Sequence, residues 1–337
     1  MRHKNNIVID ETLSTPKYRQ IVNEICRSIN SGDLKKGDKI ASLNQLCSQY
    51  HLSQDTVLMA YNELKSRGII TSQVGKGYFV QSEVTNHKHK ILLLFDRLTA
   101  YKEELYDAFK LALGNQASEQ IFFHHNNLKM FQTILEGSIT EYSHFIIMPI
   151  FGIEAQTIIG KLPAGKVFIL DQGRKDYHLR YPYVCQDFER DIYRVLKQNR
   201  DLTGKYQRLV LVVRQQRAHF KEIITGFRDY CKQHPAPFEI VSDIQQFDIR
   251  PFDGFIVVDD RDLDYLVRYA QNNNFNLGER IGIISYNETP LKGIVASGIT
   301  TITTDFAAMG RSMARMIIEN QKEKIDNPFT INKRSSF

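Results

Sequence analysis

The sequence predicts an α/β protein built from two unlike parts. The first 80 residues of the 337-residue chain have the pattern of helices followed by a short hairpin. From residue 91 onward, apolar runs of strand length alternate with stretches of helix length, which is typical of doubly wound parallel sheets. Residues 81–90 are polar and lack periodicity, so we expect a linker between domains at 1–80 and 91–337.

The composition is that of a globular protein, with 42% hydrophobic and 24% charged residues. No apolar run approaches the roughly 18 residues of a membrane span, and the first residues contain no apolar stretch of signal-peptide length. We therefore expect a cytoplasmic protein without a membrane partner. The four cysteines include no CxxC pair, which argues against a disulfide framework or a zinc site.

Positive charge is concentrated near the N-terminus. Residues 1–90 contain 13 Lys or Arg against 8 Asp or Glu, whereas the remaining residues contain 31 and 30. An excess of positive charge in one small segment is typical of a nucleic-acid-binding domain joined to a neutral one.

Three helices are predicted in the first segment. The first begins near Pro16, because proline tolerates a helix start, and ends at Gly32. The second follows Ser42. The third follows Ser53, whose hydroxyl can accept a hydrogen bond from a free backbone N–H of the first turn, and it ends at Gly68. Apolar residues at helical spacing indicate one buried face on each helix.

A β-hairpin is predicted directly after these helices. Strand-forming runs at 69–71 and 78–80 flank the sequence Gln73-Val74-Gly75-Lys76-Gly77. Two glycines around a lysine favour a tight, exposed and positively charged loop tip. Three helices with such a hairpin make a winged helix-turn-helix.

A helix-turn-helix places its second helix in the major groove of DNA, with the first turn nearest the base edges. In this chain that is the third predicted helix. Gln54 can form two hydrogen bonds with adenine, and Lys76 can approach a phosphate or a neighbouring groove. The candidate contacts to double-stranded DNA are Ser42, Asn44, Gln45, Ser53, Gln54, Asp55, Thr56, Lys65, Arg67, Gly75, Lys76 and Gly77.

Residues 17–80 resemble the winged helix of the GntR family. The resemblance rests on motifs in matching order, and it implies DNA binding. Family arginines that often contact DNA are replaced here by Gln54 and Leu58, so we expect Asn44, Gln54 and Thr56 to make the contacts instead. The motifs are Gly37-Asp38-Lys39-Ile40, Leu52-Ser53-x-Asp55-Thr56-Val57, Arg67-Gly68-Ile69-Ile70 and Gly75-Lys76-Gly77-Tyr78-Phe79-Val80.

The larger segment is predicted to hold alternating strands and helices. Its apolar runs lack polar alternation, which indicates strands covered on both faces. About 245 residues suffice for one large domain or for two linked lobes. Strands are predicted at 91–95, 120–123, 144–149, 166–170, 208–213, 238–241, 254–258 and 280–286, and helices at 102–116, 127–137, 153–160, 188–199, 218–233, 261–273 and 305–320.

Signatures of catalysis and of metal binding are weak. The sequence from Gly160 to Lys166 imitates a phosphate-binding loop, but a valine follows the lysine and the segment leads into a strand. No GxGxxG follows the first strand, so a dinucleotide site is unsupported. His124-His125 and His87-x-His89 lack further ligands at helical spacing. We therefore expect no enzyme activity, no cofactor and no metal.

The larger segment also resembles the effector domain of the LacI/GalR family, which is akin to periplasmic sugar-binding proteins. The clearest stretches are Arg280–Asn287, Ile299–Ile302, Asp305–Ala314 and a closing strand at Asn332–Ser336. The resemblance implies two lobes that enclose a sugar. It departs at Ile223, where the family often has an arginine that grips the ligand, so Arg214, Lys221 or His219 would have to substitute, or the ligand differs.

Ligands of open α/β sheets bind at the carboxyl ends of the strands. Sugars need carboxylates and amides for their hydroxyls and an aromatic platform for the ring. Strand and turn chemistry alone also favours Asp and Asn at these places. The candidate effector contacts are Asp96, Tyr101, Asp171, Gln172, Arg214, His219, Asp259, Asp260, Tyr286, Asn287 and Glu288.

Together these patterns predict a ligand-controlled transcription regulator. We expect a homodimer on a two-fold operator, because paired half-sites mirror a two-fold protein. The resemblance implies repression relieved by a monosaccharide, such as an arabinose- or fucose-type sugar. The alternatives are a DNA-binding segment fused to an enzyme-like or non-sugar ligand-binding domain, and a solute-binding protein.

Overall fold

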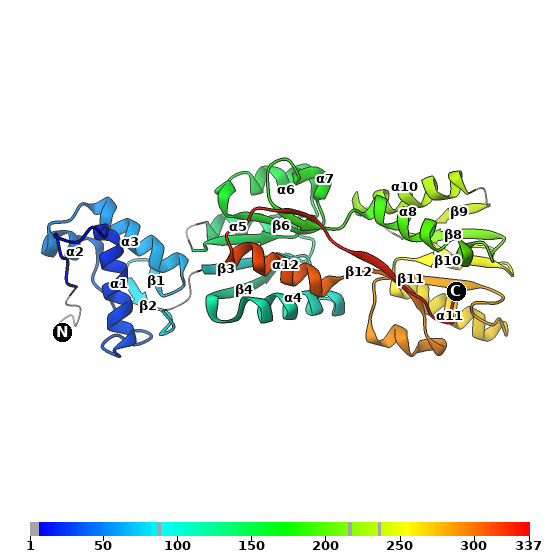
Figure 1. Ribbon diagram of the computed structural model, residues 1–337, viewed down its shortest axis with the longest axis horizontal. Coiled ribbons are helices and arrows are strands. Elements are labelled where there is room, and N and C mark those ends of the chain that lie inside the picture. The colour runs from blue at the N-terminus through cyan, green and yellow to red at the C-terminus, as the bar shows by residue number, and fades with distance from the viewer. Residues whose placement is uncertain (1–6, 86–88, 140, 215–217, 235–236) are drawn as a thin grey trace.

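The computed structural model describes residues 7–85, 89–139, 141–214, 218–234 and 237–337. Three units follow one another along its length (Figure 1). An N-terminal helical unit is followed by two α/β units, which we call the first and second lobes, and each lobe contains a six-stranded sheet. This confirms the predicted fold class and the two-lobed arrangement of the larger segment.

The N-terminal unit packs three helices on a two-stranded hairpin. Its apolar core is formed mainly by α1 and α3, with Tyr61 fully buried at the centre, donating its hydroxyl to the Ala41 carbonyl at 2.6 Å. The elements are α1 (Lys17–Asn30), α2 (Leu43–Tyr50), α3 (Gln54–Ser66), β1 (Ile70–Gln73) and β2 (Gly77–Val80). They lie where the helical periodicity and the glycine-flanked loop predict them.

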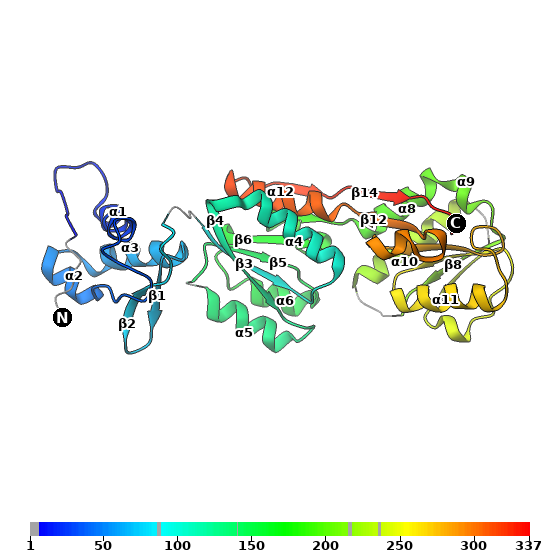
Figure 2. The same ribbon diagram turned by 90° about the horizontal axis from the view of Figure 1, so that it is seen from below.

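The first lobe is a parallel sheet in the order β13-β7-β6-β5-β3-β4. Helices α4 and α12 cover one face, and α5 and α6 cover the other (Figures 1 and 2). Its elements are β3 (His89–Phe95), α4 (Ala100–Leu113), β4 (Ala117–Phe123), α5 (Leu128–Ser138), β5 (His144–Ile147), α6 (Gly152–Ile159), β6 (Val167–Asp171), α7 (Arg174–Tyr177), β7 (Tyr183–Cys185), α12 (Phe306–Ile318) and β13 (Lys324–Asp326).

The second lobe has the order β14-β12-β11-β10-β8-β9, and only the β12–β14 pair within it is antiparallel among the described strands. Its elements are α8 (Phe188–Gln198), α9 (Arg200–Thr203), β8 (Arg208–Val212), α10 (Ala218–Gln233), β9 (Phe238–Val241), β10 (Asp253–Val257), α11 (Asp260–Asn272), β11 (Gly282–Tyr286), β12 (Thr300–Thr304) and β14 (Phe329–Asn332).

The chain crosses between the lobes after β7, after β12 and after β13. Asn327 joins two of these crossings, because its side-chain amide donates to the Thr304 hydroxyl at 2.7 Å and to the Asp305 carbonyl at 2.8 Å. Its backbone N–H donates to the Cys185 carbonyl at the end of β7. One buried residue therefore links all three crossings, through its side chain and its backbone.

Two glycines allow close packing of helix pairs within the lobes. A Cβ at Gly226 of α10 would lie 2.1 Å from the Glu189 carbonyl oxygen of α8, and a Cβ at Gly310 of α12 would lie 2.2 Å from the Leu105 carbonyl oxygen of α4. Any larger residue would push these helices apart, so close contact between the helix backbones requires glycine at these two positions.

Some strands differ from the sequence-based expectation. The short strands β7 and β13 were not predicted from periodicity, because runs of three residues are too short to show a pattern. The closing strand expected at 332–336 lies instead at Phe329–Asn332. Ser336 leaves the strand and uses its hydroxyl to donate to the Ile283 carbonyl at 2.7 Å.

Candidate DNA-binding face and effector pocket

The first turn of α3 is held in place by its N-terminal cap. The Ser53 hydroxyl accepts a hydrogen bond from the Thr56 N–H at 3.2 Å and lies 2.8 Å from the Thr56 hydroxyl. Val57, Ala60, Tyr61 and Leu64 form the buried face of the helix. The opposite face, which is exposed, consists of Gln54, Asp55, Leu58, Met59 and Asn62.

The start of α2 is organised by a capping box. The Gln45 N–H donates to the Ser42 hydroxyl at 3.3 Å, and the Ser42 N–H donates to the Gln45 side-chain oxygen at 2.8 Å. These two predicted DNA contacts therefore also serve the helix end. Asn44 between them is exposed.

The hairpin forms a projecting wing. Strands β1 and β2 pair antiparallel, with Gln73 opposite Gly77, and the Lys76 N–H donates to the Gln73 carbonyl at 3.0 Å. Gly75 and Gly77 have φ of 73° and 107°, a backbone region that favours glycine. Lys76 is exposed at the tip. Lys39 lies beside the wing, with its Cε 3.2 Å from the position of a Cβ at Gly77, and sequence reasoning did not single it out.

The structure corrects two of the predicted DNA contacts. Lys65 is only 8% exposed and forms an ion pair with Glu141 of the first lobe. Arg67 donates to the Thr85 carbonyl at 2.7 Å. Both residues lie at the C-terminal end of α3, about 18–21 Å along the helix from Ser53 at a rise of 1.5 Å per residue. Their side chains attach the helix to the rest of the protein.

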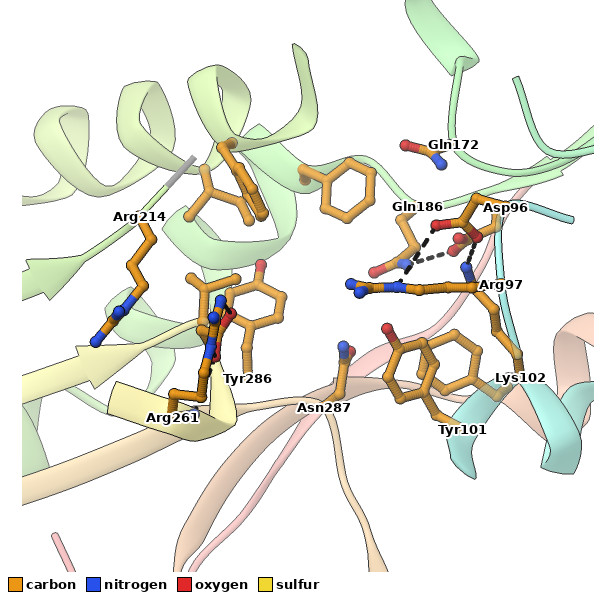
Figure 3. A pocket seen from close by; sticks show the side chains of 17 residues that line it. Asp96, Arg97, Tyr101, Lys102, Gln172, Gln186, Arg214, Arg261, Tyr286 and Asn287 are labelled. Atoms are coloured by element: carbon orange, nitrogen blue, oxygen red, sulfur yellow. Dashed lines mark hydrogen bonds and ion pairs between the residues drawn. The ribbon is translucent and has the colours of Figure 1, made fainter. Parts of the chain in front are cut away.

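A pocket opens between the two lobes, as Figure 3 shows. Its space is about 140 Å³, roughly ten times the minimum that one water molecule needs on a similar measure. Its size fits a small organic molecule rather than a single ion. In each sheet, the pocket lies at the carboxyl ends of the strands beside which the strand order reverses. Asp96 follows β3 in the first sheet. In the second sheet Arg214 follows β8, and Val258 and Asp259 follow β10. Ligands of doubly wound sheets bind at such points.

Eight of the eleven predicted effector residues line this pocket. The first lobe and the second lobe each contribute four of them. They are Asp96, Tyr101, Asp171, Gln172, Arg214, Asp259, Tyr286 and Asn287.

The other three predicted residues are placed differently. Asp260 is exposed and forms an ion pair with Lys292 at 2.8 Å. Glu288 accepts from Asn332 at 2.8 Å and from Arg334 at 2.9 Å, and also contacts Thr301, so it stabilises the edge of the second sheet. The prediction that Asp260 and Glu288 contact the effector is therefore corrected, since neither residue lines the pocket. His219 lies in α10, but its side chain falls outside the described part of the structure.

Several lining residues escaped the sequence analysis. Two are arginines that directly follow predicted acidic positions, and one lies at a crossing between the lobes. Ile223 lines the pocket where the LacI-type resemblance expects an arginine, which makes this wall apolar. The additional lining residues are Arg97, Lys102, Gln186, Phe188, Phe220, Ile223, Val258, Arg261 and Phe306.

Charges in the pocket are largely compensated within the protein. Burial alone would raise the pKa of Asp96, but the adjacent Lys102 ammonium lowers it below the ordinary value. Arg261 donates to both carboxylate oxygens of Asp259 at 3.0 Å, which lowers the pKa of Asp259. Burial raises the pKa of Asp171, whose carboxylate accepts from Gln186 at 2.6 Å.

Unpaired polar atoms also face or adjoin this space. The hydroxyl of Tyr286, which is 3% exposed, and the side-chain oxygen of Gln186 have no hydrogen-bond partner among the described protein residues. A buried polar atom without a partner costs free energy unless water or a ligand satisfies it. The pocket is therefore suited to a ligand with hydrogen-bonding groups. The Tyr101 and Phe306 rings, with centroids 4.8 Å apart, add an aromatic wall.

The histidines considered as metal ligands and the possibility of membrane-spanning helices can be compared with the described residues. His124 is fully buried and packs against Phe131 and Phe151, which lowers its pKa to about 4. No cluster of three or more His, Cys, Asp or Glu capable of holding a metal occurs within the described ranges. None of the helices described there is both long enough and apolar enough to cross a membrane. His87 lies outside the described residues.

Comparison with known proteins agrees with this arrangement. Residues 17–80 match the family described as bacterial regulatory proteins, gntR family, and residues 202–335 match the periplasmic binding protein-like domain. The HTH-type transcriptional repressor YtrA of Bacillus subtilis is 33% identical over 99 residues, which cover 29% of this chain and 72% of YtrA. The chain belongs to the GntR family of bacterial regulatory proteins.

The chain is also similar to a sugar-named repressor over a short segment and to solved structures over most of its length. The arabinose metabolism transcriptional repressor of Geobacillus stearothermophilus is 38% identical over 65 residues, which are 19% of this chain and 18% of that protein. Among solved structures, a dimeric Lac repressor superposes with a TM-score of 0.61 at 17% identity, covering 73% of this chain and 98% of that one. A GntR-type winged helix is thus fused to a fold of the LacI type.

Proposed function

We propose that this protein is a transcriptional repressor whose hold on operator DNA is released by a small sugar-type molecule. The winged helix, with α3 and the β1–β2 hairpin, reads the operator, and the pocket between the lobes binds the effector. The observation that carries the proposal is the pocket itself, which two lobes and their crossings build from polar strand ends and aromatic rings. The repressor names of two relatives support the direction of control.

The effector is proposed to be a monosaccharide of the arabinose or fucose type. Tyr286, Asn287 and Gln186 offer neutral hydrogen-bonding groups, and Tyr101 with Phe306 offers an aromatic surface for a sugar ring. Closure of the lobes around such a ligand changes the relation between them, because three crossings of the chain join the lobes at the pocket.

The first lobe transmits this change to the DNA-binding unit. The Lys65–Glu141 ion pair attaches α3 to the first lobe. We propose a homodimer whose two winged helices contact the half-sites of a two-fold operator, as expected from the dimeric Lac repressor of similar fold. A coupling of about 1–3 kcal/mol would change operator affinity by roughly 5- to 150-fold.

Fluorescence anisotropy with labelled DNA from the region upstream of the gene tests this function. The full chain is titrated in the presence of L-arabinose, D-arabinose, L-fucose, D-fucose, D-ribose or D-galactose. We expect one class of sugar to weaken DNA binding within the range given above. If the chain binds this DNA and no sugar alters the affinity, the proposal of a sugar sensor fails.

A further inference from the structure

The outward face of α3 carries two apolar side chains where a DNA-reading helix commonly carries cations. Leu58 is 38% exposed and Met59 is 52% exposed. Gln54 lies one turn before Leu58, and Asp55 lies one turn before Met59, so the two apolar side chains extend two neighbouring rows on the exposed side of the helix. No element among the described residues covers them.

The helix has no cation free to read guanine. Between Gln54 and Ser66, Lys65 is the one Lys or Arg in the sequence. Its ammonium is bound to Glu141 at 2.7 Å at the far end of the helix. The commonest specific contact to guanine uses Arg or Lys on its O6 and N7 atoms, and α3 cannot supply it.

Exposed positive charge lies on the neighbouring wing instead of on this face. Lys76 at the tip of the wing and Lys39 beside it are exposed. Such lysines suit phosphate contacts, which position a protein on DNA but do not select a sequence. The division of roles leaves base selection to the uncharged and acidic side chains of α3.

We propose that α3 reads A·T base pairs in the major groove, with Leu58 and Met59 packed on thymine methyl groups and Gln54 hydrogen-bonded to adenine. Thymine is the base that presents an apolar group in the major groove, and Gln matches the N6 and N7 atoms of adenine. Two exposed apolar side chains, of which Leu58 lies one turn beyond Gln54, fit that surface, and the wing of the same unit carries exposed lysines. The inference rests on the proposed DNA-binding function and specifies the bases that it selects.

The test uses the full chain and duplexes in which thymine is replaced by deoxyuridine, which lacks only the methyl group. A binding site is first selected from a randomised duplex library, and each thymine in a half-site is then replaced in turn. We expect the selected half-site to contain A·T pairs. Replacement at the contacted positions should weaken binding roughly 3- to 5-fold for each methyl group, as expected for loss of one buried methyl contact.

Variants assign the effect to the two side chains. In Leu58→Ala or Met59→Ala, replacement of the matching thymine should no longer weaken binding, because the partner of the methyl group is gone. Alanine suits an exposed helix position, so the fold should persist. Leu111→Ala serves as the control, since Leu111 is 86% exposed on α4 outside the DNA-binding unit, and it should keep the full effect of deoxyuridine.

The outcomes separate this inference from the proposed function. Guanine at the contacted positions, or deoxyuridine without effect in a site that the wild type selects, overturns the thymine contacts and leaves DNA binding intact. If the Leu58→Ala variant forms an assembly of different mass in solution from the wild type, and deoxyuridine has no effect, the face is a self-association surface. That result also overturns the inference. If no duplex is selected at all, both the inference and the proposed function fail.

Discussion

Lys65 of α3 forms an ion pair with Glu141 of the first lobe, with 2.7 Å between Nζ and Oε1. The Lys65 side chain is largely buried and the Glu141 side chain is partly buried. Lys90 lies 3.9 Å from the other oxygen of the same carboxylate. One acidic residue thus holds two lysines, of which one belongs to the candidate reading helix and the other to strand β3.

Replacing the carboxylate should destabilise this contact. We expect Glu141→Gln to lower the free energy of unfolding by about 1–3 kcal/mol, because it leaves a buried ammonium without its counter-charge. Adding Lys65→Met should recover part of the loss, which chemical denaturation would measure as non-additivity. Glu136→Gln is the control, since its pair with Lys161 is exposed and should contribute less than about 1 kcal/mol. Equal losses in both variants would contradict this account.

Operator binding should separate base reading from phosphate contact. Gln54→Ala should cost about 1–3 kcal/mol and relax the sequence preference at its position. Lys76→Ala should weaken binding to all sequences and reduce the slope of log affinity against log salt by about 1. Anisotropy titrations at several salt concentrations measure both. Arg27→Ala should change neither, since Arg27 lies on α1, outside α3 and the wing, and pairs with Glu24 of the same helix. A uniform loss in all three variants would refute the division of roles.

The Tyr286 hydroxyl should lower the stability of the unliganded protein and raise its affinity for the effector. Tyr286→Phe removes a buried hydroxyl that lacks a protein partner, so the unliganded variant should be as stable as the wild type or more stable, by up to about 1 kcal/mol. Its affinity for the effector should fall about 5- to 10-fold, on the scale of one lost hydrogen bond. Thermal unfolding and calorimetric titration measure the two quantities.

Tyr206→Phe is the matched control for this prediction. The Tyr206 hydroxyl is also buried without a partner among the described residues, but Tyr206 does not line the pocket. Its removal should affect stability in the same way and leave effector affinity unchanged. Unaltered affinity in Tyr286→Phe would exclude the hydroxyl from the site.

Stability should fall in mildly acidic solution because of His124. Burial lowers the pKa of His124 to about 4 from the ordinary 6.5, so the unfolded chain takes up the proton first as the pH falls. The free energy of unfolding is not reduced by His124 above pH 6.5, where the imidazole is neutral in both states. It falls between pH 6.5 and about 4, by about 2–3 kcal/mol in total. Burial lowers the pKa of His144 to about 4 as well, and it adds a loss of the same sign.

Denaturation curves at pH 7.5 and pH 5 test this dependence. His124→Gln should show a smaller difference between the two pH values than the wild type. His125→Asn, a change at the exposed neighbour whose φ of 48° suits asparagine, should keep the full difference. An unchanged difference in His124→Gln would assign the acid sensitivity to other groups.

Helical periodicity and strand-length apolar runs were enough to predict the longer helices and most of the longer strands. Each predicted helix of the larger segment corresponds to an observed one, because its apolar face is repeated over several turns. The polar residues at strand ends led to the pocket for a physical reason. Parallel strands end at the same edge of a sheet, so residues such as Asp96 and Arg214 meet although they are far apart in sequence.

Contacts between distant segments were beyond the reach of such patterns. Nothing near Lys65 in the sequence indicates that Glu141 neutralises it, so sequence patterns alone predict a DNA contact there. Glu288 follows a strand as the pocket residues do, yet Arg334 and Asn332 from the end of the chain engage it. Arg97 and Lys102 directly follow the predicted residues Asp96 and Tyr101. They line the pocket because of the direction of their side chains, which sequence patterns do not give.

Reciprocal linkage tests the central claim most directly. If filling the pocket alters operator binding, then the operator must alter effector binding by the same factor. Calorimetric titration of the sugar that is active in the anisotropy assay should give a dissociation constant roughly 5- to 150-fold weaker with saturating operator than without it. Equal constants in both conditions, for a sugar that binds the pocket, would contradict control of DNA binding by this site.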